Sequence, residues 1–213
     1  MDGSTRAVGR KVGRKPAFTE EDVIDAALAE GVDRFTLAAV AARIGVVTPA
    51  IYRVFRSRDD VVRACLTTLA GTFRLPEPTA DWRAVLRLWA DESWRLCEEY
   101  PGLPRAVYAY PLAVTVIENV VAGYTAVLID QGWTAGQAAF ALDFIGDTVF
   151  ASHLGIQEMR STDADGARAL DRVRDAAADD AILRPTDSWI GRGVIDTKVD
   201  FIITGLEHHR PSL

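Results

Sequence analysis

A short segment of the chain places a hydroxyl group, an aromatic ring and two guanidinium groups at helical spacing. Thr48, Tyr52 and Arg56 are four residues apart, and Pro49 and Arg53 repeat that spacing one residue later. On an α-helix these residues share one face. Thr can pack its methyl group on a thymine methyl, and Arg can donate two hydrogen bonds to guanine. A recognition helix presents such a face to the major groove of DNA.

Two short apolar helices joined by a turn are expected to position that face. The chain reads TLAAVAARIGVVTPAIYRVF over residues 36–55. Thr36 is the predicted N-cap of the first helix, and Gly45 ends it in the left-handed conformation. The second helix is predicted to begin at Pro49, with Thr48 as its N-cap. The pattern indicates a helix-turn-helix, although an ordinary αα-hairpin with a solvated Arg face has the same spacing.

Charge is distributed unevenly along the chain. The 213 residues carry a formal net charge of -6, which taken alone argues against a nucleic-acid partner. Residues 1–70, however, hold 11 Lys+Arg against 9 Asp+Glu, and residues 71–213 hold 13 against 21. The first 15 residues alone carry +4, with Arg14 and Lys15 at their end. This asymmetry favours a basic end for a polyanion and an acidic body, although a solvated or targeting terminus has the same composition.

Three segments in the first third of the chain form a combined pattern: FTEEDVIDAALA, FTLAAVAARIGVVTPAIYRVF and RSRDDVV. Together, from Phe18 to Leu66, they closely resemble the N-terminal domain of the tetracycline-repressor (TetR) family. Three residues depart from that family's pattern. Val47 stands where serine is usual, Val54 where histidine is usual, and Arg58 where lysine usually opens the fourth helix. None of these changes removes the resemblance.

The resemblance implies that this domain binds double-stranded DNA. Tyr52 and Arg58 match family positions that usually touch the DNA backbone, and Thr36 lies at a helix N-terminus that suits a phosphate. Arg14 and Lys15 could enter the minor groove or touch phosphates. The expected DNA-binding residues are basic, hydroxyl-bearing or apolar: Arg14, Lys15, Thr36, Val47, Thr48, Pro49, Tyr52, Arg53, Arg56 and Arg58.

Helical periodicity continues to the C-terminus, and no segment alternates with a period of two residues. We expect an all-α protein of about nine helices. It would consist of a flexible basic arm over residues 1–17 and an N-terminal three-helix helix-turn-helix DNA-binding domain over 18–74. The resemblance implies that residues 75–213 form a C-terminal helical ligand-binding and dimerisation domain.

Aromatic and polar side chains of the second domain are candidates for a ligand pocket. Asp143 and Asp147 lie one turn apart in an apolar helix, where like charges repel. They could meet a cationic ligand or Arg partners across a dimer, and we favour the second interpretation. Helical aromatic residues are more often plain core, and a hydroxyl such as that of Ser93 more commonly bonds back to its own helix. The candidate pocket residues are Trp89, Ser93, Tyr108, Tyr110, Tyr124, Asp143, Phe144 and Asp147.

Two helices, over about residues 134–156 and 194–208, are apolar on most sides. An all-round apolar terminal helix needs a partner, so these two helices from each of two subunits could form a four-helix interface. The alternative is that both are internal core. The expected interface residues are Phe150, His153, Ile195, Val199, Ile202 and Leu206.

Enzymatic and membrane functions find little support in the sequence. The chain has three His and two Cys, Cys65 and Cys97, and it lacks a phosphate-binding glycine loop and a nucleophile elbow. We therefore expect no catalytic residues, metal site or cofactor. No run of about 18 uncharged apolar residues occurs, so we expect no membrane span and a cytoplasmic protein.

The family resemblance thus implies a ligand-responsive transcriptional regulator and favours a repressor over an activator. It would bind a palindromic operator as a homodimer, with half-sites about 34–36 Å apart or a multiple of that distance. A small-molecule effector would release it. The alternatives are a helical protein-interaction module and a small-molecule-binding protein without an operator.

Overall fold

The computed structural model describes residues 18–212, which form eleven α-helices, one 3-10 turn and an isolated β-bridge. The all-α prediction is confirmed. The N-terminal helices are α1 (Glu20–Glu30), α2 (Leu37–Arg43), α3 (Thr48–Ile51) and α4 (Arg58–Ala70). The body contains α5 (Trp82–Glu99), α6 (Leu103–Ala109), α7 (Ala113–Val116), α8 (Glu118–Ile129), α9 (Ala135–Arg160), α10 (Ala169–Ala176), η1 (Asp187–Ile190) and α11 (Gly193–His208).

Two α-helices more than expected arise in the segment with several prolines. Helix α6 forms there, with Pro104 in its first turn, where a missing N–H costs no hydrogen bond. The helix predicted over residues 111–130 is divided at Ile117 into α7 and α8. The arm over residues 1–17 lies outside the described residues.

Local capping explains where the main helices begin. Thr19 accepts a hydrogen bond from the Asp22 N–H at 3.2 Å, and the Asp22 carboxylate accepts the Thr19 N–H at 2.7 Å. This reciprocal pair is a capping box. Thr134 and Gln137 form a second capping box at the start of α9. Gly31 ends α1 at a φ of 101°, a conformation that a side chain would strain.

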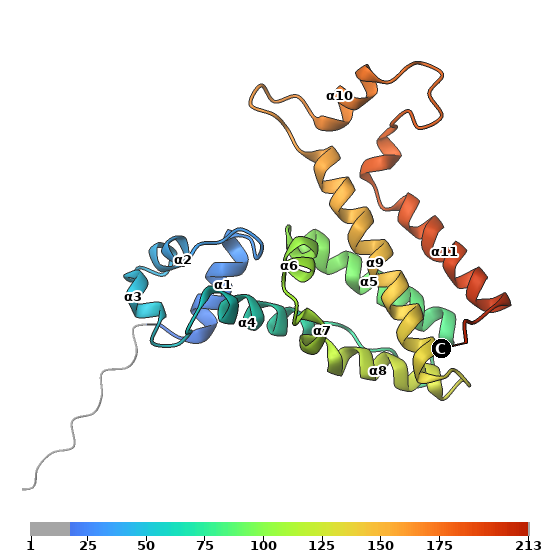
Figure 1. Ribbon diagram of the computed structural model, residues 1–213, viewed down its shortest axis with the longest axis horizontal. Coiled ribbons are helices and arrows are strands. Elements are labelled where there is room, and N and C mark those ends of the chain that lie inside the picture. The colour runs from blue at the N-terminus through green and yellow to red at the C-terminus, as the bar shows by residue number, and fades with distance from the viewer. Residues whose placement is uncertain (1–17, 213) are drawn as a thin grey trace, which may run out of the picture.

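Two apolar cores stabilise the chain. The first joins α1 to α4 around Val23, Val40 and Ile51, all fully buried, and it extends to Leu96 and other side chains of α5 and α6. The second core lies in the body (Figure 1). There α5 packs along α9, and this pair is flanked by α8 and by α11. Burying one large aliphatic side chain contributes roughly 1.5–3 kcal/mol. Helix α4 belongs to the first core and also contacts α7 of the body.

Helix α9 is long and apolar enough, by length and composition alone, to cross a membrane. Core helices of globular proteins pass the same test. Here α9 lies in the middle of the helical body and packs against α5, α8 and α11 (Figure 1). These contacts account for the apolar inner side of α9, although only 33% of its apolar 18-residue window is buried.

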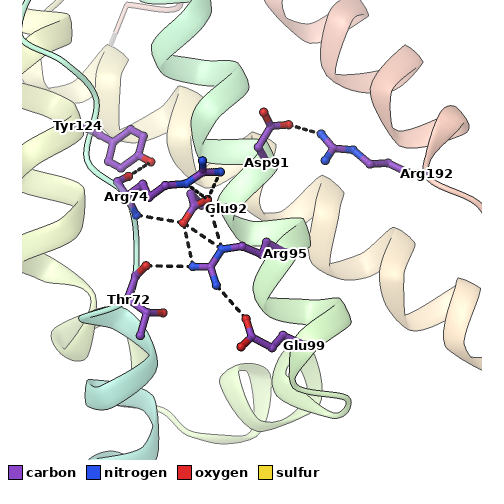
Figure 2. Close-up of polar contacts among 8 residues, drawn as sticks. All are labelled: Thr72, Arg74, Asp91, Glu92, Arg95, Glu99, Tyr124 and Arg192. Carbon is purple, nitrogen blue, oxygen red and sulfur yellow. Dashed lines mark hydrogen bonds and ion pairs between the residues drawn. The ribbon is translucent and has the colours of Figure 1, made fainter.

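A buried carboxylate holds the connection between α4 and α5 (Figure 2). Glu92, fully buried on α5, accepts hydrogen bonds from the Arg74 backbone N–H at 3.0 Å and its Nε at 2.7 Å. Arg95 adds an ion pair at 2.8 Å and also donates to the Thr72 carbonyl at 3.0 Å. The Tyr124 hydroxyl donates to the Arg74 carbonyl at 2.6 Å. These bonds fix the segment that leads from the first domain into the body.

Candidate functional site

The exposed face of α3 lies at one end of the molecule, far from α9 and α11 (Figure 1). Ile51 anchors this short helix in the first core, because its side chain is fully buried. On the opposite side Tyr52 is 54% exposed, and Pro49 and Arg53 are exposed as well. Arg56 is also exposed, whereas Thr48 is half-buried. Helix α3 ends at Ile51, so Tyr52, Arg53 and Arg56 follow it in a turn and do not continue the predicted helix.

The start of α3 differs from the prediction. Its N-cap is Val47 and not Thr48, and the cap makes no side-chain hydrogen bond because valine has no acceptor. Thr48 is instead the first helical residue, so its hydroxyl is not used as a cap. Val47 is 71% exposed. Its isopropyl group thus joins the exposed face, where an apolar side chain could pack on a thymine methyl.

Thr36 occupies the N-terminus of α2, as predicted. Its hydroxyl oxygen accepts the Ala39 N–H at 3.1 Å, and the residue is exposed. The hydroxyl hydrogen is left for a further acceptor, and the helix dipole favours an anion at this end. A phosphate oxygen fits both requirements. Arg14 and Lys15, the two predicted contacts from the arm, lie outside the described residues.

Arg58 has a different environment from the one predicted. Its Nε donates to the Phe35 carbonyl and its Nη2 to the Asp33 carbonyl, both at 3.0 Å. The guanidinium also lies 4.5 Å from the centre of the Phe35 ring. These bonds tie the start of α4 to the loop between α1 and α2. The geometry gives Arg58 a structural role, and its predicted phosphate contact stays a prediction.

Replacing Arg58 by alanine should lower the free energy of unfolding by about 2 kcal/mol, because two charge-assisted hydrogen bonds to buried carbonyls are lost. Urea denaturation followed by circular dichroism measures the change. The matched control is Arg56→Ala, which removes an exposed guanidinium next to the same helix. An Arg58→Ala protein with unchanged stability and weakened DNA binding would restore the phosphate-contact prediction.

A cavity of about 810 Å³ lies between α4, α5, α6, α7 and α9. Six of the eight predicted pocket residues line it: Trp89, Ser93, Tyr108, Tyr110, Asp143 and Asp147. The rest of the lining is mainly apolar and includes Leu66 and Leu69 of α4 and Phe73 from the α4–α5 connection. The volume falls in the range that accommodates drug-sized ligands, roughly 300–1,000 Å³.

The cavity contains few polar groups. The Tyr108 hydroxyl donates to Asp147 Oδ1 at 3.1 Å. Burial and the nearby carboxylates of Asp147 and Asp143 raise the pKa of Tyr108 to about 12, so this phenol remains a donor at neutral pH. Burial, followed by repulsion from Asp147, raises the pKa of Asp143 above its ordinary value. Ser93 is 1% exposed, and its hydroxyl has no hydrogen-bond partner within residues 18–212.

Known proteins match both parts of this architecture. Residues 24–65 match the family model described as bacterial regulatory proteins, tetR family. Over 106 residues the chain is 28% identical to the HTH-type transcriptional repressor DrrR1 of Streptomyces coeruleorubidus, a match that spans 47% of this chain and 39% of that relative. Residues 24–65 therefore form a TetR-family domain.

Solved structures of TetR-family proteins share the whole fold. ActR of Streptomyces coelicolor in complex with actinorhodin is 18% identical, with a TM-score of 0.67 over 90% of this chain and 97% of that one. A TetR variant from Acinetobacter baumannii AYE in complex with minocycline is 20% identical, with a TM-score of 0.59 over 92% of this chain and 96% of that one. These likenesses extend the TetR-family fold from residues 24–65 to the helical body.

Two predicted pocket residues of this chain lie outside the cavity lining. Tyr124 is fully buried in the core of the body, where its ring packs edge-on against Trp89 and its hydroxyl bonds to Arg74. Phe144 lies on the outer side of α9, 47% exposed, with its ring 5.7 Å from that of Phe140. The prediction was wrong for both, because aromatic type alone does not say which side of a helix a ring occupies.

The predicted dimer-interface residues also face inward in this TetR-family fold. Ile195, Val199, Ile202 and Leu206 are all buried in the body's core. His153 is fully buried beside Glu98, with its Nε2 2.8 Å from Glu98 Oε1, and Phe150 lines the cavity. The interpretation as internal core, stated as the alternative, is correct for these side chains.

Several cavity residues carried no signal in the sequence. Leu66, Leu69, Phe73, Phe140 and Phe150 lie on elements far apart in the chain, and each fits an ordinary core pattern. Only tertiary packing brings them around one space. The spacing of Asp143 and Asp147, one turn apart on α9, was a local feature that pointed to this cavity.

Proposed function

We propose that this chain is a DNA-binding transcriptional regulator whose affinity for its operator is controlled by a small molecule in the cavity. One observation carries the proposal: a wall of the cavity is made by α4, which also belongs to the DNA-binding core. Leu66 and Leu69 contribute to both. A ligand that contacts them is coupled to the position of α3 through packed side chains.

The DNA-binding half rests on the exposed face of α3 and on the family relationship. Thr48, Pro49 and Arg53 are proposed to read base edges, and Val47 to pack on a thymine methyl. Thr36 and Tyr52 would contact phosphates, with Arg56 beside them. The acidic residues of the body lie away from this end, so the net charge of -6 does not oppose binding.

The control mechanism is a population shift. The protein is proposed to have two conformations, and in one of them the position of α4 prevents DNA binding. A ligand that binds this conformation more tightly than the DNA-binding one weakens operator binding, at most by the ratio of the ligand's affinities for the two conformations. We infer repression over activation because the relative DrrR1 is named a transcriptional repressor. A regulator of this kind acts in the cytoplasm and needs no catalytic residues.

Dimerisation is proposed to use the outer sides of α9 and α11. Phe144 and Phe201 are 47% and 80% exposed there. Exposed small residues continue each surface, Ala151 and Gly155 on α9 and Gly205 on α11, and would allow close helix approach. We name this surface the α9–α11 face. Two-fold pairing of it would present two α3 helices to a palindromic operator.

Selection from a random pool of DNA duplexes tests the proposal. An inverted repeat with half-sites about 34–36 Å apart, or a multiple of that distance, is expected. Affinity for the selected duplex should fall steeply with salt, because phosphate contacts release counterions. Failure to retain any duplex at low salt would overturn the proposal.

Arg53→Ala should weaken binding to the selected duplex by roughly 1–3 kcal/mol and relax its sequence preference. Fluorescence anisotropy with the selected and a scrambled duplex measures both effects. Arg87→Ala is the matched control, since Arg87 is exposed on α5 in the body and pairs only with Asp200. Equal losses on both duplexes would make Arg53 a phosphate contact instead of a base-reading residue.

A further inference from the structure

The charged groups of the cavity are all negative. Among the described lining residues Asp143 and Asp147 are the only charged ones, and no Lys, Arg or His accompanies them. Neither carboxylate forms an ion pair within residues 18–212. They lie one helical turn apart on α9, where like charges repel. A cation placed between them would remove that repulsion.

A second group points into the same space. The Ser93 hydroxyl is almost completely buried at the cavity wall and has no hydrogen-bond partner in the described part of the chain. Leaving a buried hydroxyl unpaired is unfavourable. A polar atom of a ligand that reaches Ser93 would recover this cost. A ligand that satisfies both sites would therefore carry a positive charge near the carboxylates and a separate polar atom near the Ser93 hydroxyl.

Aromatic rings form much of the remaining wall. Phe73 and Trp89 pack with ring centres 5.3 Å apart, and Tyr108 meets Phe150 edge-on at 6.4 Å. All four line the cavity. Flat apolar molecules pack well on such rings, and the ring faces attract cations. The Tyr108 hydroxyl donates to Asp147, which holds that carboxylate beside the rings.

We propose that the cavity binds an organic cation: an extended, mostly apolar ring system that carries a positively charged nitrogen group held by Asp143 and Asp147, with a polar group that reaches Ser93. The organic cation is the proposed ligand class of the cavity. That this ligand is also the effector that controls DNA binding rests on the proposed function. An inorganic or multiply charged polyamine ligand would leave the aromatic wall unused. An anion would meet two carboxylates with no compensating cation.

Two xanthene dyes of similar shape and opposite charge test the inference with the full-length protein. Rhodamine 6G is a cation and fluorescein an anion at neutral pH. Fluorescence polarisation should show rhodamine 6G binding at least about tenfold more tightly than fluorescein, a difference of about 1.4 kcal/mol. In the double variant Asp143→Asn, Asp147→Asn, the ratio of the two dye affinities should fall by about tenfold. Asp130→Asn, an exposed carboxylate outside the cavity, should leave it unchanged.

The outcomes separate this inference from the proposed function. Equal affinity for both dyes, or a preference that survives in the double variant, overturns the inference. A double variant that becomes monomeric without changing dye affinity also overturns it, because the carboxylates then pair with Arg across a dimer. Dye binding that depends on the carboxylates but never weakens operator binding supports the ligand class and overturns the regulatory function.

Discussion

Replacing Glu92 by alanine should lower the free energy of unfolding by about 3 kcal/mol, because the change removes a buried carboxylate that holds two guanidinium groups and a backbone N–H. Glu92 is fully buried, whereas the side chains of Arg74 and Arg95 are 67% and 34% exposed. The two cations can therefore be hydrated when their partner is lost. This access to water keeps the loss at the lower end of the range for a broken buried pair.

The stabilisation by Glu92 should depend on pH in a defined direction. Burial alone raises its pKa, but hydrogen bonds from Arg95 and Arg74 outweigh burial and lower the pKa to about 2 from an ordinary 4.5. A carboxyl group with a lowered folded-state pKa stabilises the protein above its unfolded pKa. The contribution should be complete above pH 4.5 and should decline as the pH falls toward 2.

Urea unfolding, followed by tryptophan fluorescence at pH 7 and at several values below 4.5, measures both effects. The isosteric Glu92→Gln variant should differ from the original chain at pH 7 and converge with it in acid. Glu99→Gln is the matched control, because Glu99 pairs with the same Arg95 but is 51% exposed. The Glu99→Gln substitution should lower the free energy of unfolding by less than about 1 kcal/mol. Equal losses for the two variants would show that the buried position of Glu92 is unimportant.

Much of the fold could be predicted because its signals are local. Thr19 and Thr134 begin helices through capping boxes, and Gly31 ends one where positive φ is needed. Each signal spans four residues or fewer. The exposed face of α3 followed from helical spacing alone, since one side of that helix had to bury Ile51. The N-cap of α3 was misplaced by one residue, because Thr48 is the better capping residue in isolation.

The remaining errors concern interactions between distant segments. Arg58 bonds to carbonyl groups 23 and 25 residues earlier, and no local pattern identifies a carbonyl as a partner. Glu92, for which the sequence pattern provides no expectation, has Arg95 three residues away, but its second partner, Arg74, comes from the preceding connection. Helix α11 is apolar on more than one side, so periodicity could not decide whether Val199 or Phe201 faces the core.

Phe201→Glu should convert the proposed dimer into a monomer and weaken operator binding by about 100-fold, because the two half-sites would then be bound independently. Phe201 is 80% exposed at the centre of the α9–α11 face, so an acidic side chain there costs the folded protomer little. In a two-fold interface the same substitution occurs twice, and two carboxylates would replace two packed rings.

Sedimentation velocity reports the oligomeric state, and fluorescence anisotropy with the selected duplex reports the affinity. Ile129→Glu is the matched control: Ile129 is also an exposed apolar residue, 44% accessible, but it lies at the end of α8, outside the α9–α11 face. It should remain dimeric and bind the duplex almost unchanged, which separates dimer loss from the added negative charge. A Phe201→Glu protein that stays dimeric would move the interface away from α11, since no packed two-fold surface tolerates a pair of carboxylates at its centre.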